Sequence, residues 1–136
     1  MLRLIFVGMT CLAPFAAQAQ NDHFRHNDTA RHCAVNETPS NPSWMCMREM
    51  KQDYESYLKL RRTAENTTAL IGALNRCERE YGVRWDSVRR CAIDQDAAMR
   101  DIQHIMETRD LPRSLITQCV MRSHEDIPRI KRCLIN

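Results

Sequence analysis

Three histidines near the start of the chain are the side chains best suited to bind a transition metal. His23, His26 and His32 lie in a polar stretch, at spacings that a flexible chain can bring around one ion. If Asn21 were the N-terminal residue, the segment 21–23 would form a square-planar copper or nickel chelate. If a signal peptide is instead cleaved off ahead of Gln20, His23 lies one position too far from the new N-terminus for that geometry. The alternative to metal binding is a solvated polar tail.

The remaining candidates for chemistry have simple structural explanations. His104 lies between Asp101 and Glu107 on one helix face, which is the minimum for acid–base catalysis, but no nucleophile accompanies it. The chain has no Gly-rich phosphate loop, no His-Glu-x2-His motif and no serine hydrolase motif. Thioethers can bind Cu(I), yet methionines at helical spacing more often fill gaps in a core. The sequence therefore predicts a protein that is not an enzyme and has no cofactor.

Six of the seven cysteines follow an alternating spacing. The successive intervals are 13, 31, 14, 28 and 14 residues, which indicates an internal repeat of about 42 to 45 residues. Each short interval has a turn near its centre, at residues 39–42, 81–84 and 123–126. Two cysteines equidistant from the bend of a helical hairpin come abreast on its arms, within the roughly 7 Å that a disulfide allows. We therefore predict three local disulfides: Cys33–Cys46, Cys77–Cys91 and Cys119–Cys133.

Zinc binding is the alternative explanation for a set of cysteines. Zinc ligands usually come in tight Cys-x2-4-Cys pairs, and these six cysteines form none. Disulfides require an oxidising compartment, which agrees with the start of the chain. Arg3, an apolar run from Leu4 to Ala13 and the Ala17–Ala19 segment are typical of a signal peptide over residues 1–19. The apolar run is far shorter than the roughly 20 residues that span a bilayer, and Cys11 would be removed with it.

Hydrophobic periodicity predicts an all-α fold, a small disulfide-stapled bundle of helical hairpins with about five helices. One helix runs from Trp44 to a break at Glu65–Thr68, and a second ends at Gly82. Asp86 is expected to cap a third helix, Asp110 a fourth with Pro112 in its first turn, and Pro128 begins the last. We expect residues 20–42 to be a flexible polar segment and residues 43–136 to be the stapled helical domain, with no membrane span in the mature chain.

The charge distribution gives no sign of a nucleic-acid partner. The formal net charge is +3 and falls to about +2 once Arg3 is removed, which is too small and too mixed for a nucleic-acid groove. Acidic residues gather at the starts of the expected helices and basic residues at their ends, as the helix dipole favours.

Part of the chain is similar to known exported proteins. The pattern Cys77-x3-Tyr81-x4-Asp86-x-Val88-x2-Cys91-x3-Gln95 resembles a short Cys-paired helical repeat of uncharacterised exported bacterial proteins, and the resemblance covers roughly the last 60 residues. It implies a helical, disulfide-bonded fold and an envelope location, and no activity. A fainter similarity, to LprI-type lysozyme inhibitors, lies in the first Cys pair and in Trp85-x3-Arg89-x-Cys91. The Leu-Asn-x2-Tyr stretch of those inhibitors is absent here.

These observations predict a non-catalytic interaction module, periplasmic or secreted, that binds another envelope protein. Trp44 and Trp85 are candidates either to clamp the stapled turns or to contact a partner, with Arg89 and Arg90 beside Trp85. An LprI-like inhibitor of an envelope hydrolase is one alternative function. The handling of copper or another transition metal through His23, His26 and His32 is the other.

Overall fold

The computed structural model describes residues 24–136, and over these residues the fold is all-α, as predicted. No named strand lies in this range, where an isolated bridge joins Thr38 to Asn41. The predicted signal peptide and His23 lie outside the described residues. The helices are α2 (His26–Val35), α3 (Ser43–Thr63), α4 (Thr68–Tyr81), α5 (Trp85–Thr108), α6 (Arg113–Ser123) and α7 (Ile127–Ile135).

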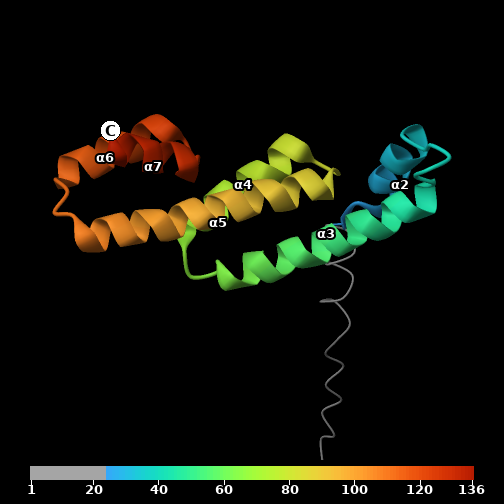
Figure 1. Cartoon of the computed structure of the whole chain (residues 1–136), viewed down its shortest axis with the longest axis horizontal. Helices are drawn as coiled ribbons and strands as arrows, with labels where there is room; N and C mark the ends of the chain where they lie inside the picture. The colour runs from blue at the N-terminus through green and yellow to red at the C-terminus, as the bar shows by residue number, and fades with distance from the viewer. Residues whose placement is uncertain (1–23) are drawn as a thin grey trace, which may run out of the picture.

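The long helix α5 is the centre of the molecule. It packs against α3 and α4 near its start and against α7 further along, while α6 packs on α7 and α2 on α3 (Figure 1). Figure 1 shows α3 along one side of α5, with α4 and the α6–α7 pair along the other. The chain is therefore a series of three helical hairpins, α2–α3, α4–α5 and α6–α7.

A disulfide joins the two arms of each hairpin, and all three predicted pairs are confirmed. The Cα–Cα distances are 5.6 Å for Cys33–Cys46, 5.9 Å for Cys77–Cys91 and 5.6 Å for Cys119–Cys133. Each pair is 13 or 14 residues apart, so that each disulfide closes one turn. By chain entropy, closing such a loop contributes about 3 kcal/mol to stability.

An aromatic cluster joins the first two hairpins. The Trp85 ring, on the first residue of α5, lies 4.6 Å from the Tyr54 ring and 6.2 Å from the Phe24 ring, centroid to centroid. The indole Nε1 of Trp85 donates a hydrogen bond of 3.1 Å to the Phe24 carbonyl oxygen. Trp85 is only 2% exposed, and its ring therefore fixes the start of α5 against both α3 and the residues ahead of α2.

A polar cluster fixes the end of α3 against α4. Arg61 donates from Nη1 to the Tyr57 hydroxyl at 2.8 Å and to Glu78 Oε1 at 2.6 Å, and from Nη2 to Asn75 Oδ1 at 2.8 Å. The Tyr57 hydroxyl also donates to Glu78. Burial, followed by this bond to Glu78, raises the pKa of Tyr57 far above its ordinary value. The phenol therefore stays neutral in the folded protein.

Helix boundaries largely follow the sequence pattern, with three differences. Residues 26–35, within the segment expected to be flexible, form α2, where Thr29 and Cys33 are buried one turn apart. Asp86 lies in the first turn of α5 instead of capping it, because the helix already begins at Trp85. Pro112, not Asp110, is the residue that precedes α6. Pro128 does lie in the first turn of α7, which Asp126 caps by accepting from the Arg129 backbone N–H.

Candidate functional site

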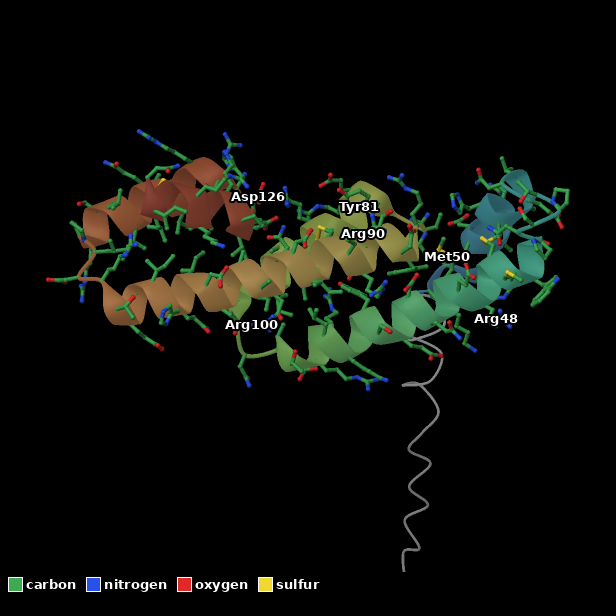
Figure 2. The ribbon with its side chains drawn as sticks, in the orientation of Figure 1. Arg48, Met50, Tyr81, Arg90, Arg100 and Asp126 are labelled. Carbon is green, nitrogen blue, oxygen red and sulfur yellow. A yellow bond between two sulfur atoms is a disulfide. The ribbon has the colours of Figure 1, made fainter. Side chains whose placement is uncertain are left out.

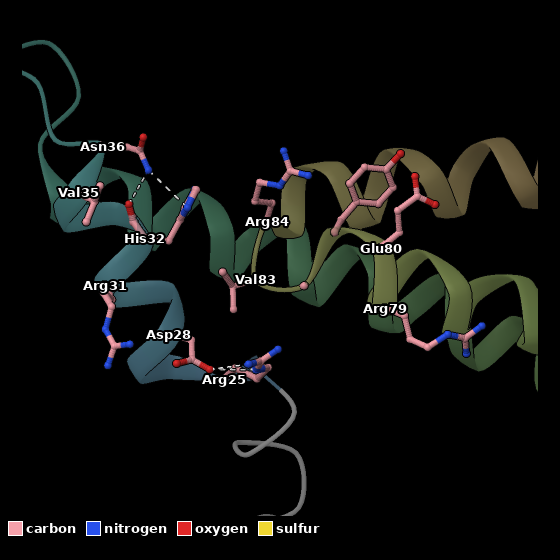
Figure 3. Close-up of a pocket in the computed structure, with 12 residues that line it drawn as sticks. Arg25, Asp28, Arg31, His32, Val35, Asn36, Arg79, Glu80, Val83 and Arg84 are labelled. Atoms are coloured by element: carbon pink, nitrogen blue, oxygen red, sulfur yellow. Dashed lines mark hydrogen bonds and ion pairs between the residues drawn. The ribbon is translucent and has the colours of Figure 1, made fainter.

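An open groove separates α2 from the turn between α4 and α5. Its volume is about 620 Å³, and Figure 3 shows the residues that line it. Four arginines and two carboxylates lie on its walls, so the lining carries a net positive charge. We call this cleft the basic groove; its lining is Arg25, Asp28, Arg31, His32, Val35, Asn36, Arg79, Glu80, Tyr81, Gly82, Val83 and Arg84.

One wall of the basic groove is α2. Arg25 is neutralised within this wall, because its Nη2 lies 2.7 Å from Asp28 Oδ2. Arg31 is exposed and has no carboxylate partner within residues 24–136. The Asn36 side chain donates to the His32 carbonyl oxygen at 2.8 Å, which orders the end of the wall. Val35 is 79% exposed, so this wall also presents an apolar side chain.

The opposite wall is the end of α4 and the turn into α5. Gly82, at φ 60°, provides the left-handed conformation that this tight turn needs, and any side chain there would be strained. Arg84 is exposed and lies over the Tyr81 ring, with its Cζ 5.4 Å from the ring centroid. A hydrogen bond with Glu80 raises the pKa of Tyr81. In Figure 3 the Val83 side chain lies between the two walls.

The electrostatics of the basic groove follow from which of its charges are paired. Arg25 is paired with Asp28, and Arg79 is paired with Glu125, Nη2 to Oε2 at 2.8 Å. Arg31 on one wall and Arg84 on the other have no carboxylate partner within the part of the chain that the structure describes. Glu80, on the same wall as Arg84, forms a hydrogen bond with Tyr81 and no ion pair within residues 24–136. The unpaired charges that line the groove therefore sum to one positive charge, which favours an anion between the walls.

The predicted histidine cluster is not brought together over the described residues. His32 lines the basic groove, whereas His26 lines a separate cleft of about 660 Å³ with Phe24, Met47, Arg48 and Lys51. No group of three or more His, Cys, Asp or Glu side chains within residues 24–136 is placed to hold a metal ion. The described residues therefore do not add a ligand set to the predicted metal site.

The candidate interaction residues divide into two groups. Of the two roles predicted for Trp85, contact with a partner is wrong, because its ring is buried in the aromatic cluster and its N–H is already bonded. Arg89 is held by Asp53 on α3, Nε to Oδ1 at 2.6 Å. Trp44 is 61% exposed and lies beneath Arg48, whose Cζ is 5.3 Å from the ring centroid. Arg90 is exposed on α5 (Figure 2). Trp44 and Arg90 are thus the accessible members of the set.

Fold and groove together define a class of protein: a short series of disulfide-stapled helical hairpins with a basic groove between two of them. No protein-family model, no curated protein and no solved structure matches this chain. Three disulfides are consistent with a protein outside the reducing cytoplasm. Between residues 24 and 136, none of the helices is both long enough and apolar enough to span a bilayer.

Proposed function

We propose that this chain is a non-catalytic, exported interaction module, periplasmic or secreted, that binds another protein of the envelope through the basic groove. The observation that carries the proposal is that two stapled hairpins hold unpaired arginines on facing walls of one open cleft. A binding surface on loops would lose conformational entropy when a partner binds. Here the disulfides of α2–α3 and α4–α5 have already restricted both walls, so less entropy remains to be lost.

The composition of the groove supports a protein partner over a small molecule. Arginine is enriched at protein interfaces, and the exposed Val35 and the Val83 side chain add apolar surface beside Arg31 and Arg84. A mixed apolar and cationic cleft of this kind fits side chains that project from a folded partner. The cleft is open to solvent along its length, unlike the enclosed pockets that bury most of a small ligand.

The surroundings of His104 support a non-catalytic role. His104 is exposed, and the nearby Asp101 is bound instead to Lys131 on α7, with Nζ 2.5 Å from Oδ2. The Lys131 ammonium lowers the pKa of Asp101, chiefly through this hydrogen bond. The ionised Asp101 therefore connects α5 to α7 through Lys131. A carboxylate held in this way is not disposed to exchange protons with His104.

Site-specific photo-crosslinking in the native host tests the proposal. A photoreactive residue at Val35 and, separately, one at Val83 should attach the same partner protein, because the two positions lie on facing walls. Met121, which is 71% exposed on α6, is the matched apolar control and should give no adduct with that partner. The adduct should survive chelators. Equal adducts at all three positions, or adducts that chelators abolish, would contradict the proposal.

An inhibitor of an envelope hydrolase is a special form of the same proposal, in which the partner is the hydrolase. Trp85 and Arg89, which carry the similarity to LprI-type inhibitors, are engaged in packing and in an ion pair. The inhibitor form therefore depends on the basic groove and not on those two residues. It predicts that the purified protein slows peptidoglycan hydrolysis by the crosslinked partner, and that Arg31→Glu with Arg84→Glu relieves the inhibition. Unchanged hydrolysis at saturating protein would exclude it.

A further inference from the structure

The second and third hairpins are copies in the same register. Counted from their first cysteines, Cys77 and Cys119, each turn has a residue with positive φ at the same place, Gly82 in one and His124 in the other, and Glu125 of the third hairpin has positive φ as well. The first residues of α5 and α7, Trp85 and Ile127, also correspond, and both are almost completely buried. Positions in one hairpin can therefore be compared directly with positions in the other.

The turn of the third hairpin is sealed against α4 by ion pairs. Glu125 Oε2 accepts from Arg79 Nη2 at 2.8 Å, and Asp126 Oδ2 lies 3.6 Å from Arg76 Nη1. Gly72 gives Glu125 room, because a Cβ on that glycine would lie 3.3 Å from Glu125 Oε1. We call this contact the closed junction. Figure 2 shows Asp126 where the α6–α7 hairpin approaches α4.

In the same register, the basic groove lies between the first and second hairpins where the closed junction lies between the second and third. The turn residues Glu125 and Asp126 correspond to Val83 and Arg84. The α4 residues Gly72, Arg76 and Arg79 correspond, counted from Cys77 and Cys33, to Asp28, His32 and Val35 of α2. All five corresponding residues line the basic groove. The groove is thus the corresponding junction one hairpin earlier, with the two acidic turn residues replaced by valine and arginine, the two arginines by histidine and valine, and the glycine by aspartate.

These replacements remove the ion pairs that hold the closed junction together. In the closed junction the cations lie on α4 and the anions on the turn, so the two sides attract each other. In the basic groove Arg84 lies on the turn and Arg31 on α2, while Glu80 at the end of α4 is the one carboxylate of the lining that is not in an ion pair. Arg31 and Arg84 cannot pair with each other, and the lining has a single unpaired carboxylate, so an added anion can bind there.

We infer that the basic groove takes two adjacent carboxylates of the partner protein, presented on a turn, as Glu125 and Asp126 are presented in the closed junction. The inference rests on the proposed function and specifies the chemistry of its partner. The partner's acidic turn lies between α2 and the α4–α5 turn, with its carboxylates against Arg31 and Arg84. Val35 and Val83 contact the apolar residues that flank the acidic pair.

Peptide binding to the full mature protein tests the inference independently of the partner's identity. The probe is a capped peptide of residues 123–128, Ser-His-Glu-Asp-Ile-Pro, and its control has Gln and Asn in place of Glu and Asp. The acidic peptide should shift the backbone NMR signals of the groove residues, and the amide control should not. Arg31→Glu with Arg84→Glu should weaken binding by roughly tenfold, because two ion pairs are reversed. Arg62→Glu, an exposed arginine on α3, is the matched control and should leave binding unchanged.

Two further variants make the result independent of any one substitution. His32→Arg, Val35→Arg, Val83→Glu and Arg84→Asp together give the groove the four charged residues of the closed junction, and this variant should keep its helicity while losing peptide binding. The double charge reversal should bind a peptide with Lys-Lys in place of Glu-Asp. Binding that both variants leave unchanged would overturn the inference.

The remaining outcomes separate the inference from the proposed function. Peptide binding that is absent or equal for the two peptides overturns the inference, while crosslinks from Val35 and Val83 would still support a protein partner. Tighter binding of inorganic phosphate or of phosphatidylglycerol vesicles at the same residues also overturns it. Crosslinks only between copies of this chain overturn the proposed partner, while selective peptide binding would still support the chemistry of the groove.

Discussion

Removal of the Cys33–Cys46 disulfide should release α2 from an otherwise intact protein. The double substitution Cys33→Ala and Cys46→Ala opens a loop with a sequence separation of 13. By chain entropy, this lowers the free energy needed to release α2 from α3 by about 3 kcal/mol. Since 1.4 kcal/mol is a factor of ten, the open population should rise roughly 100-fold. α2 lies at one end of the hairpin series and packs mainly on α3, so it can open while α5 keeps its contacts with α3, α4 and α7.

Native-state hydrogen exchange measures this effect helix by helix. Backbone amides of residues 26–35 should exchange roughly 100-fold faster in the variant, while amides of α5 keep their rates. The matched control, Cys119→Ala with Cys133→Ala, opens a loop of nearly the same size at the other end of the chain and should accelerate exchange in α6 and α7 instead. Equal acceleration in α2 and α5, or no acceleration in α2, would refute the reasoning. Crosslinking from Val83 should fall with the α2 wall released.

Three other predictions concern the core. The raised pKa of Tyr57 means that folding favours its neutral phenol. The stabilisation from the neutral phenol is complete below about pH 10 and is lost as the pH rises further. The phenolate absorbance should therefore appear together with loss of helicity, and reversible ionisation in the folded protein would contradict this. Gln95→Leu removes the side chain that accepts from the buried Ile127 N–H at 2.9 Å, and should lower the free energy of unfolding by about 1–3 kcal/mol in a denaturant titration. Trp85→Ala should lower the free energy of unfolding by about 3–5 kcal/mol, whereas Trp44→Ala should change it by no more than about 0.5 kcal/mol. Similar losses for the two variants would be inconsistent with the different burial of the two side chains.

The disulfide pairing and the helix order were predictable because both depend on local spacing. A turn halfway between two cysteines determines which of them can meet, and the break at residues 64–67 between α3 and α4 follows from the loss of apolar periodicity there. The helix α2 was not predictable in this way. It buries only Thr29 and Cys33, so its sequence reads as polar, and its disulfide and its packing on α3 hold it in place.

The candidate site was harder to predict, because it depends on which residues face each other across two hairpins. Helix periodicity places Trp85 at the start of α5 but does not say whether that end faces solvent or Tyr54 and Phe24. Arginines at helix ends suit the helix dipole equally well whether or not a carboxylate faces them. One signal was present in the sequence: the turn after Cys119 carries Glu125 and Asp126, and the turn after Cys77 carries Val83 and Arg84 at the same positions.

Each cystine of the described chain joins two cysteines that are consecutive in the sequence. In the proposed exported protein, freed of residues 1–19 and therefore of Cys11, Cys33 reaches the oxidising compartment first, Cys46 follows, and Cys77 arrives later. At every stage the nearest available thiol is then the correct one, and the short loop costs less entropy to close than any other. We therefore expect a simple thiol oxidase to suffice for maturation, without an isomerase to correct mispaired cysteines.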